Sequence, residues 1–334
     1  MITMVDIARL TGVSQSTVSR VLNGNTSVKS DVRNRVLKCA REHNYQPNII
    51  ARSLNGSKTY LIGVIITDIS NPFFSDIVKS IEEEASKQGY SIMLFNTEYK
   101  LTKEQEYLQI LKRYKVDGVL IVPCGNGSKY EQNLSDENIP MVSITRNMKK
   151  IDSVFISHYE AGRKVAKHLI NIGYGSFIYF GSKDDEKEQG YKDELINNKI
   201  NLEKNYVFIE NDSSLEVKLK EFFKKQEHCE GIGIFAQNDV NALIILQVLK
   251  EMNVLIPQDV ALVGFDNTFI SKITSPSITS IAQPIDEIGR VSVSRLIEII
   301  DSNNSKKECL NCQLDTRLIT RQSSIATIRS YIDK

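Results

Sequence analysis

The sequence has no apolar run that approaches the roughly 20 residues needed to span a membrane. Its first residues, MITMVDIARLTG, lack the basic start and the apolar block of a secretory signal. The cysteines are few, odd in number and scattered, which suits a reducing compartment better than a disulfide scaffold. We therefore expect a cytoplasmic protein with no membrane partner. The five cysteines are Cys39, Cys124, Cys229, Cys309 and Cys312.

Motifs of the common enzyme classes are also missing. There is no phosphate-binding P-loop and no G-x-S-x-G nucleophile motif. Cys309 and Cys312 form a single C-x-x-C, without the second pair that completes a structural zinc site, so we interpret it as coincidence rather than as a metal or redox centre. We expect no catalytic residue, no cofactor and no metal. The four histidines also lack metal-ligand spacing: His43, His158, His168 and His228.

The charge is unevenly distributed along the 334 residues, a length that predicts two or three domains. Residues 1–60 carry nine Lys or Arg against three Asp or Glu, a net charge of +6, whereas the remaining residues have a net charge of −5. A small basic segment on a mildly acidic body is typical of nucleic-acid binding. The alternative is a chance distribution of surface charge.

The basic segment predicts three short helices. Apolar residues recur at helical spacing in residues 4–11, and Gly12 can take the positive φ that reverses the chain. Ser14 is a candidate N-cap for a second helix that ends at Asn23-Gly24, and a third runs from about 31 to 44. Helix, tight turn, helix and supporting helix is the helix-turn-helix arrangement.

The second helix is expected to turn its valines inward and its polar side chains outward. Arg contacts guanine with two hydrogen bonds, and Gln, Ser and Thr suit adenine or phosphate oxygens, so this face fits a DNA major groove. The alternative is the solvated face of a small helical bundle. The outward residues are Gln15, Ser16, Thr17 and Arg20.

Residues 47–59 form a candidate linker. Pro47 breaks the preceding helix, Asn48 is a candidate cap, and Gly56 closes a segment of about two helical turns, which is marginal as an isolated helix. Leu54 lies in this short polar segment with no obvious core to cover it. The segment is either an ordinary linker or a helix that forms only when something holds it.

From residue 61 onward, short apolar strands alternate with amphipathic helices, which predicts parallel sheets covered on both faces. The number of strands favours two doubly wound halves over one sheet. Helices are expected near 75–88, 103–114, 160–172, 214–227, 238–252 and 285–301. The ten predicted strands are 61–67, 90–96, 118–123, 140–145, 153–157, 176–181, 206–210, 231–236, 260–265 and 278–283.

Polar residues follow several of these strands, where parallel sheets bind their ligands. Asp266 follows the strand VALVGF, Asn238 follows GIGIFAQ, and Phe73 and Phe74 lie just beyond the first strand. Carboxylate and amide groups near aromatic rings suit a polyhydroxylated sugar. Each residue also has a structural alternative: a cap for Asn238, a cap or turn for Asp266, and core packing for the two phenylalanines.

Three stretches together resemble the lactose/galactose-repressor (LacI/GalR) family of bacterial transcription regulators. They are VDIARLTGVSQSTVSRVLNG, YQPNIIARSLNG and VALVGFDN, and the likeness extends over essentially the whole chain. The resemblance implies a helix-turn-helix head, a hinge helix, and a body of two subdomains similar to periplasmic sugar-binding proteins, joined by three crossover strands. It also implies an effector cleft between these subdomains.

The resemblance also implies roles for residues near the DNA. Gln15, Ser16 and Arg20 match major-groove contacts, and Thr17 and Asn23 match positions near the phosphates. Leu54 matches a wedge that kinks the duplex from the minor groove. The DNA-binding set implied in this way, with the helix caps and hinge positions added, is Ser14, Gln15, Ser16, Thr17, Arg20, Asn23, Asn48, Ala51, Arg52, Leu54 and Asn55.

Two positions in the implied cleft depart from the family pattern. Lys187 stands where an arginine is usual, and Ser157, followed by His158, stands where an aspartate is common. Lysine lacks the planar fork of arginine, which argues against an ordinary neutral-sugar inducer and leaves open a phosphorylated ligand, an unusual ligand or weakened control by small molecules. The expected effector-binding residues are Phe73, Phe74, Ser157, Lys187, Asn238 and Asp266.

The sequence as a whole predicts an α/β transcriptional regulator in the bacterial cytoplasm, associated with the nucleoid. We expect a homodimeric repressor of a carbohydrate-related operon that binds a near-palindromic double-stranded DNA operator under the control of a sugar or sugar-phosphate effector. The alternative is a catabolite-control-type regulator governed by a phosphorylated carrier protein. The expected domains are 1–46, 47–59 and 60–334, the last with subdomains of about 60–158 plus 286–318 and 159–285 plus 319–334.

Overall fold

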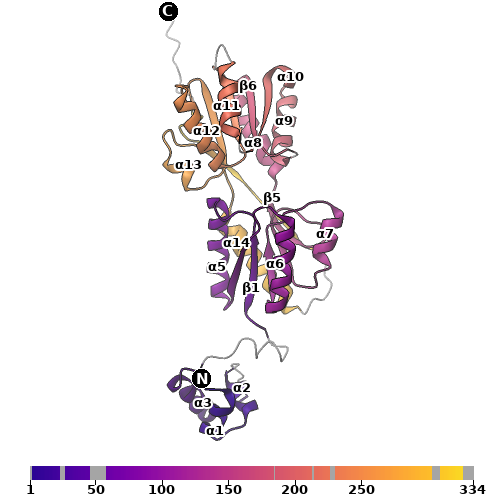
Figure 1. The fold of residues 1–334 in the computed structure, drawn as a ribbon, viewed down its shortest axis with the longest axis vertical. Coiled ribbons are helices and arrows are strands. Elements are labelled where there is room, and N and C mark those ends of the chain that lie inside the picture. Colours follow the sequence, from indigo (N-terminus) through magenta and orange to yellow (C-terminus); the bar gives the residue numbers. More distant parts are fainter. Residues whose placement is uncertain are drawn as a thin grey trace, which may run out of the picture. The chain divides into compact units, whose positions relative to one another are not determined.

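The computed structural model of the chain consists of two compact units, Met1–Tyr60 and Leu61–Lys334 (Figure 1). Each unit is described by itself below. We call the first unit the head and the second the body. The structure describes residues 2–22, 27–45, 58–183, 185–212, 214–225, 230–302 and 309–325.

The head contains the three predicted helices, α1 (Met4–Thr11), α2 (Gln15–Leu22) and α3 (Ser30–Glu42). Gly12 ends α1 with a φ of 65°, a left-handed conformation that glycine adopts without a steric penalty. The helical spacing of residues 4–11 rests on Val5, Ile7, Ala8 and Leu10, but Val5 and Leu10 do not face inward, because they are 51% and 59% exposed. Thr11 and Cys39 are buried instead, next to a small core formed by Ile7, Ala8, Val18, Val21, Val36 and Ala40.

The body contains two six-stranded sheets, and we call the sheets with their helices the first and the second lobe. Both sheets are parallel except at β12, which pairs antiparallel with β10. The first sheet has the order β11 (Asn311–Leu314), β5 (Asp152–Ile156), β4 (Met141–Thr145), β3 (Gly118–Ile121), β1 (Leu61–Ile66) and β2 (Ser91–Asn96). The second has the order β12 (Arg317–Ile319), β10 (Thr279–Ala282), β9 (Val260–Asp266), β8 (Ile232–Ala236), β6 (Ser176–Gly181) and β7 (Tyr206–Glu210).

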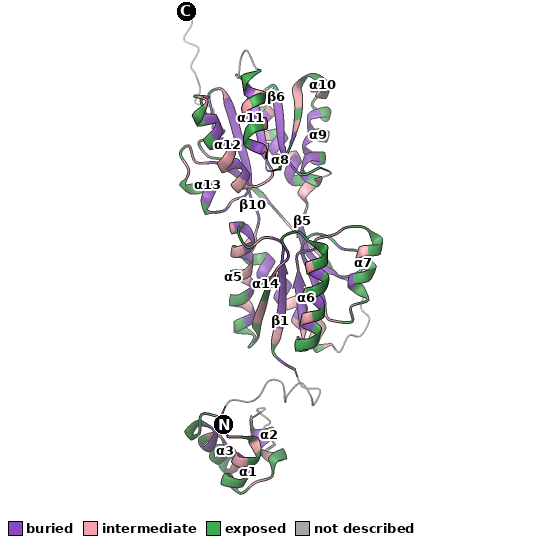
Figure 2. Ribbon diagram, in the orientation of Figure 1, coloured by how far each residue is buried: buried purple, intermediate pink, exposed green. Residues whose placement is uncertain are grey.

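Helices cover both faces of each sheet, which is why the central strands are buried along their whole length (Figure 2). The first lobe packs α5 (Pro72–Lys87) and α14 (Ile285–Asp301) on one face, and α6 (Leu101–Tyr114) and α7 (Ser128–Ser135) on the other. The second lobe packs α11 (Leu215–Lys224) and α12 (Asp239–Glu251) on one face, and α8 (His158–Asn171) and α9 (Glu186–Asn197) on the other. Two short helices, α10 (Leu202–Asn205) and α13 (Phe269–Ile273), complete it.

The chain passes between the lobes three times. β5 belongs to the first sheet and leads into α8, and β10 belongs to the second sheet and leads back into α14. The last passage, from β11 to β12, lies between Leu314 and Arg317. The sequence placed this passage a few residues later, after 318, because it gave no sign of two strands only three and four residues long.

The ten predicted strands are confirmed, and β11, β12, α7, α9, α10 and α13 were not predicted. α9 has the sequence EKEQGYKDELIN and buries Lys187, Glu188 and Glu194 together with two apolar residues. An amphipathic pattern is therefore weak in this segment. None of the helices in the part of the chain that the structure describes is long and apolar enough to cross a membrane.

α8 and α9 approach each other closely at two glycines. A Cβ added to Gly162 would lie 2.0 Å from the carbonyl oxygen of Lys187. A Cβ added to Gly190 would lie 1.9 Å from the carbonyl oxygen of Tyr159. Both obstacles are backbone atoms, so no side-chain rotation relieves them, and the first turns of the two helices are held in direct contact.

We expect Gly190→Ala to destabilise the second lobe by 3 kcal/mol or more, about the upper end of the cost of overpacking, since the helices must separate to admit the methyl group. Urea unfolding followed by far-UV circular dichroism measures the loss. Gly175→Ala is the matched control, because its Cβ would have no neighbour within 4 Å. Equal stability of the two variants would contradict the close packing of α8 on α9.

Candidate functional site

The exposed face of α2 carries the side chains that the sequence assigned to DNA. Gln15, Ser16 and Arg20 are exposed, while Val18 and Val21 are buried in the core of the head. The predicted polar face is therefore present, and no core contact competes for these side chains. Gln15 and Arg20 belong to α2 itself, so a rigid helix presents them together.

Ser14 caps α2 from outside the helix. Its Oγ accepts a hydrogen bond from the backbone N–H of Thr17 at 3.2 Å, and it lies 2.8 Å from the Oγ of Ser16 and 2.9 Å from the Oγ1 of Thr17. The contacts of Ser14 with Thr17 are therefore those of a cap at the N-terminus of α2. The other predicted DNA contacts lie outside the described residues: Asn23, Asn48, Ala51, Arg52, Leu54 and Asn55.

Phe73 and Phe74 lie in the first turn of α5 and pack into the core of the first lobe. They are 4% and 8% exposed, and their ring centroids are 5.1 Å apart in an edge-to-face arrangement. Both phenylalanines therefore pack in the core, which was the structural alternative to a role in ligand binding. Their burial leaves little ring surface for stacking on a ligand in this structure.

Ser157 and Asn238 both cap helices. Ser157 Oγ accepts from the N–H of Glu160 at 3.1 Å at the start of α8, and Asn238 Oδ1 accepts from the N–H of Asn241 at 2.8 Å at the start of α12. Both remain partly exposed. The capping alternative thus holds for Asn238, and the same role explains Ser157.

Lys187 is buried, with only 8% of the residue exposed. Its Nζ donates to the carbonyl oxygen of Gln237 at 3.0 Å, pairs with Asp185 Oδ2 at 3.6 Å, and lies 4.4 Å from the centroid of the Phe265 ring. A cation in this position is stabilised by both the carboxylate and the aromatic face. Lys187 therefore brings the start of α9 against the ends of β8 and β9.

Asp266 ends β9 in a conformation that L-residues rarely adopt, with a φ of 97°. The residue is 5% exposed, and its Oδ1 accepts from Gln283 Nε2 at 2.7 Å. Burial raises the pKa of its carboxyl to about 7, and the nearby charge of Asp239 contributes to the rise. Strained backbone of this kind gathers at functional sites, so Asp266 is the strongest of the predicted ligand residues.

Gln283 is the functional candidate that the sequence analysis missed. It is 8% exposed, its Nε2 donates to Asp266, and its Oε1 is buried without a hydrogen-bond partner among the residues that the structure describes. Such an acceptor is costly unless a ligand or water completes it. Its signal was available, because Gln283 is the polar residue that closes the predicted strand 278–283.

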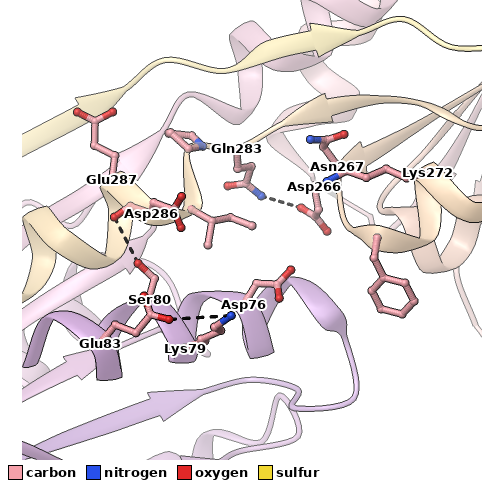
Figure 3. Close-up of a pocket in the computed structure, with 13 residues that line it drawn as sticks. Asp76, Lys79, Ser80, Glu83, Asp266, Asn267, Lys272, Gln283, Asp286 and Glu287 are labelled. Carbon is pink, nitrogen blue, oxygen red and sulfur yellow. Dashed lines mark hydrogen bonds and ion pairs between the residues drawn. The ribbon is translucent and has the colours of Figure 1, made fainter. Parts of the chain in front are cut away.

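Asp266 and Gln283 lie together in a pocket of about 560 Å³ to which both lobes contribute (Figure 3). Figure 3 shows the two side chains joined by their hydrogen bond above α5, with Ser80 bonded to the backbone of Asp286 beside them. Of the six predicted effector residues, this pocket includes Asp266 alone. The lining residues are Asp76, Lys79, Ser80, Glu83, Asp266, Asn267, Phe269, Lys272, Gln283, Pro284, Ile285, Asp286 and Glu287.

Metal-ligating side chains do not gather anywhere in the described ranges: no group of three or more His, Cys, Asp or Glu residues there is placed to hold a metal ion. Cys124 follows the end of β3 by three residues, and burial raises the pKa of its thiol to about 11, which disfavours a reactive thiolate. The arrangement of the site is suited to hydrogen bonding of a polar ligand.

Asp266 gives the protein a distinctive pH dependence. Its pKa is about 7 in the folded state and 3.8 ordinarily, so between these values the folded state holds a proton that the unfolded state releases. Asp266 therefore stabilises the fold fully below about pH 4, and this contribution is lost as the pH rises through 7. We expect the free energy of unfolding of Asp266→Asn to fall less over this pH range than that of the wild type. The difference amounts to about 1.4 kcal/mol for each pH unit by which folding raises the pKa of Asp266.

The measurement is urea unfolding of both proteins from pH 4 to pH 8. Asp239 has a pKa of about 6, raised by burial, and contributes with the same sign, so the variant should keep part of the slope. Asp286→Asn removes an exposed carboxylate from the same pocket and controls for the loss of one charge. An unchanged slope in Asp266→Asn would mean that Asp266 titrates at its ordinary pKa.

Comparison with known proteins agrees with this geometry. Residues 3–48 match the family model "Bacterial regulatory proteins, lacI family", and residues 166–324 match "Periplasmic binding protein-like domain". A "Ribose operon repressor" of Halalkalibacterium halodurans is 32% identical over 330 residues, which cover 97% of each chain.

Two solved structures are also similar. A lac repressor dimer bound to operator and the anti-inducer ONPF shares the fold, with a TM-score of 0.85 at 24% identity over 97% of this chain and 99% of that one. A LacI-type protein of Alkaliphilus metalliredigens complexed with D-xylulofuranose has a TM-score of 0.69 at 27% identity, over 80% of this chain and 100% of that one. The chain therefore belongs to the lacI family of bacterial transcriptional regulators, which pair a DNA-binding head with a ligand-binding body and are not enzymes.

Proposed function

We propose that this protein is a repressor of a carbohydrate-related operon, and that a small polar ligand bound between the lobes controls its affinity for the operator. The observation that carries the proposal is the buried Asp266–Gln283 pair, with an unused Gln283 Oε1 in a pocket formed by both lobes. A ligand that completes this pair contacts β9 and the β10–α14 passage at once. It thereby acts on the relative placement of the two lobes.

The class of ligand that we propose is a sugar or a sugar derivative. A carboxyl with a pKa near 7 and an amide oxygen bind hydroxyl groups readily, because the carboxyl both donates and accepts when it is protonated. Two similar proteins are named for ribose or bound to D-xylulofuranose, which supports this class. Ser157, Asn238, Phe73 and Phe74 then act as positioning residues, since they cap or anchor the helices around the pocket.

For the head, we propose that Gln15, Ser16 and Arg20 contact base edges in the major groove, whereas Thr17 and Asn23 lie near phosphates. Two copies are required to contact a near-palindromic site, so the active form is a homodimer in the bacterial cytoplasm, at the nucleoid. The hinge positions follow the same proposal: Asn48, Ala51 and Asn55 near the minor groove, Arg52 near a phosphate, and Leu54 as the wedge.

The operator is first isolated by selection of genomic fragments, and its affinity is then titrated with pentoses, hexoses and their phosphates. We expect at least one of them to change the operator Kd by tenfold or more in the wild-type protein and not in Asp266→Ala. Asp212→Ala removes an exposed carboxylate of the same lobe and should respond like the wild type. A wild-type Kd that changes with a phosphorylated carrier protein and with none of the sugars would overturn the small-ligand proposal.

Arg20→Ala is expected to relax the preference for one base pair in each half-site, because a bidentate contact to guanine is worth about 1–3 kcal/mol. The measurement is selection of bound DNA from a random pool, followed by sequencing. Arg9→Ala is the control, since Arg9 is exposed on α1 and pairs with Asp6 at 3.0 Å. A weaker but equally selective Arg20 variant would make Arg20 a phosphate contact instead.

A further inference from the structure

A second polar group of the body lies near Asp266 but on the α8–α9 side of the second lobe. The His158 ring stacks on the Phe265 ring, with centroids 5.8 Å apart and an interplanar angle of 18°. Lys187 Nζ lies 4.4 Å from the centroid of the same ring. Phe265 directly precedes Asp266 at the end of β9, and the charge of Lys187 is near enough to Asp266 to act against the rise in the pKa of its carboxyl.

Asp185 is the carboxylate that faces these basic groups, and its oxygens are already used. Oδ1 accepts from the N–H of Lys187 at 2.9 Å, and Oδ2 accepts from Tyr179 Oη at 2.7 Å and from Gln237 Nε2 at 3.1 Å. Lys187 Nζ is a fourth neighbour, at 3.6 Å. Asp185 therefore balances the charge of Lys187, and no hydrogen bond joins it to His158 among the residues that the structure describes.

His158 has no hydrogen-bond partner among the residues that the structure describes. The charged groups that face it are Lys187 and Asp185 from the second lobe and Arg146 from the first. Burial lowers the pKa of His158 to about 3, and the charge of Lys187 is the second largest cause of the shift. The ring is therefore neutral at physiological pH. A neutral imidazole on which two permanent cations act is ready to gain a proton when an anion arrives.

Arg146 comes from the opposite lobe. It follows Thr145 at the end of β4, where a β-branched residue has a φ of 71°, and its guanidinium Nη1 donates to the carbonyl oxygen of Gly125 at 3.3 Å. Arg146 is exposed. Arg146 therefore contributes a cation from the first lobe whose charge acts on His158.

Two helix N-termini add to the positive potential. α8 begins at His158 and α9 at Glu186, and the glycine contacts described above hold their first turns together. Each N-terminus favours a negative charge nearby. Neither would make a site alone, but α8 begins with His158 and the first turn of α9 contains Lys187.

We propose that His158, Lys187 and Arg146 form the receptor for an anionic group, so that the effector is a phosphorylated or acidic sugar. This inference rests on the proposed function and names the chemical class of its ligand. The sugar hydroxyls bind at Asp266 and Gln283, and the phosphate or carboxylate binds at the basic group. His158 takes up one proton from solvent as the anion binds.

The first test is NMR titration of the histidine side chains, of which the chain has only four. We expect inorganic phosphate or D-ribose 5-phosphate, at constant ionic strength, to raise the pKa of His158 from about 3 by at least three units, so that the ring gains a proton near neutral pH. His168 is the internal control, since its Nε2 lies 2.8 Å from Ser324 Oγ and its pKa is lowered by burial alone. His158→Gln assigns the resonance.

The second test is calorimetric titration of the protein in the absence of DNA. Each of two sugars is compared with its phosphate and its acid: D-ribose with D-ribose 5-phosphate and D-ribonate, and D-glucose with D-glucose 6-phosphate and D-gluconate. We expect a phosphate or an acid to bind at least tenfold more tightly than its parent sugar at pH 6, and less tightly as the pH rises to 8. His158→Gln should abolish this pH dependence. Arg146→Gln, a change at an exposed residue, should reduce the advantage of the anion even if Lys187→Met fails to fold.

The outcomes separate this inference from the proposed function. If a neutral sugar binds as tightly as its phosphate and acid, or if no anion shifts the pKa of His158, the inference is wrong, while sugar control of operator affinity stands. If an anion binds with the expected proton uptake but leaves the operator Kd unchanged, the anion site stands and the proposed function fails. Binding of phosphates alone or of sugar acids alone tells which anionic group the site accepts.

Discussion

The proposed ligand site depends on the buried carboxylate of Asp239. This residue is 1% exposed, and its oxygens accept hydrogen bonds from the N–H of Thr268 at 2.7 Å, from Thr268 Oγ1 at 3.0 Å and from Ser280 Oγ at 2.7 Å. It joins the start of α12 to the loop after β9 and to β10. A Cβ on Gly264 would lie 2.4 Å from Asp239 Oδ1, so the strand has room for this carboxylate only because glycine is there.

The bonds to Asp239 determine where Asp266 and Gln283 lie. Asp266 precedes Thr268 by two residues, and Gln283 follows Ser280 by three, so each side of the ligand pair is tied to the same anchor. Burial keeps the pKa of Asp239 at about 6 even with three donors around it. The negative charge of Asp239 in turn helps to raise the pKa of Asp266. The anchor thus influences both the geometry and the protonation of the site.

The sequence predicted the fold well because its strands carry continuous apolar runs between amphipathic helices. It singled out Asp266 as a candidate ligand residue because an acidic residue after the run VALVGF stands out. It did not predict α9, whose buried face contains Lys187 and Glu188 and whose close contact with α8 depends on Gly190. Packing of that kind has no signature in hydrophobic periodicity, because backbone contacts rather than apolar side chains produce it.

The individual site residues were harder to predict than the fold. A single Asn or Ser after a strand is equally suited to capping and to binding a ligand, and the structure shows capping at Asn238 and Ser157. The rings of Phe73 and Phe74 lie in a core that forms only when α5 packs on the sheet. Such choices depend on contacts between distant segments, which spacing along one chain does not specify.

The replacement of arginine by Lys187 has a structural explanation. The ammonium is compact, and three neighbours satisfy it: the Gln237 carbonyl, the Phe265 ring and Asp185. A guanidinium needs a pair of free carboxylate oxygens for its planar fork, whereas both oxygens of Asp185 already accept hydrogen bonds. Lys187 therefore supplies a fixed charge whose own contacts lie within the second lobe. The adjustable charge of this region is then His158, whose neutral ring is maintained by burial and by the fixed cation beside it.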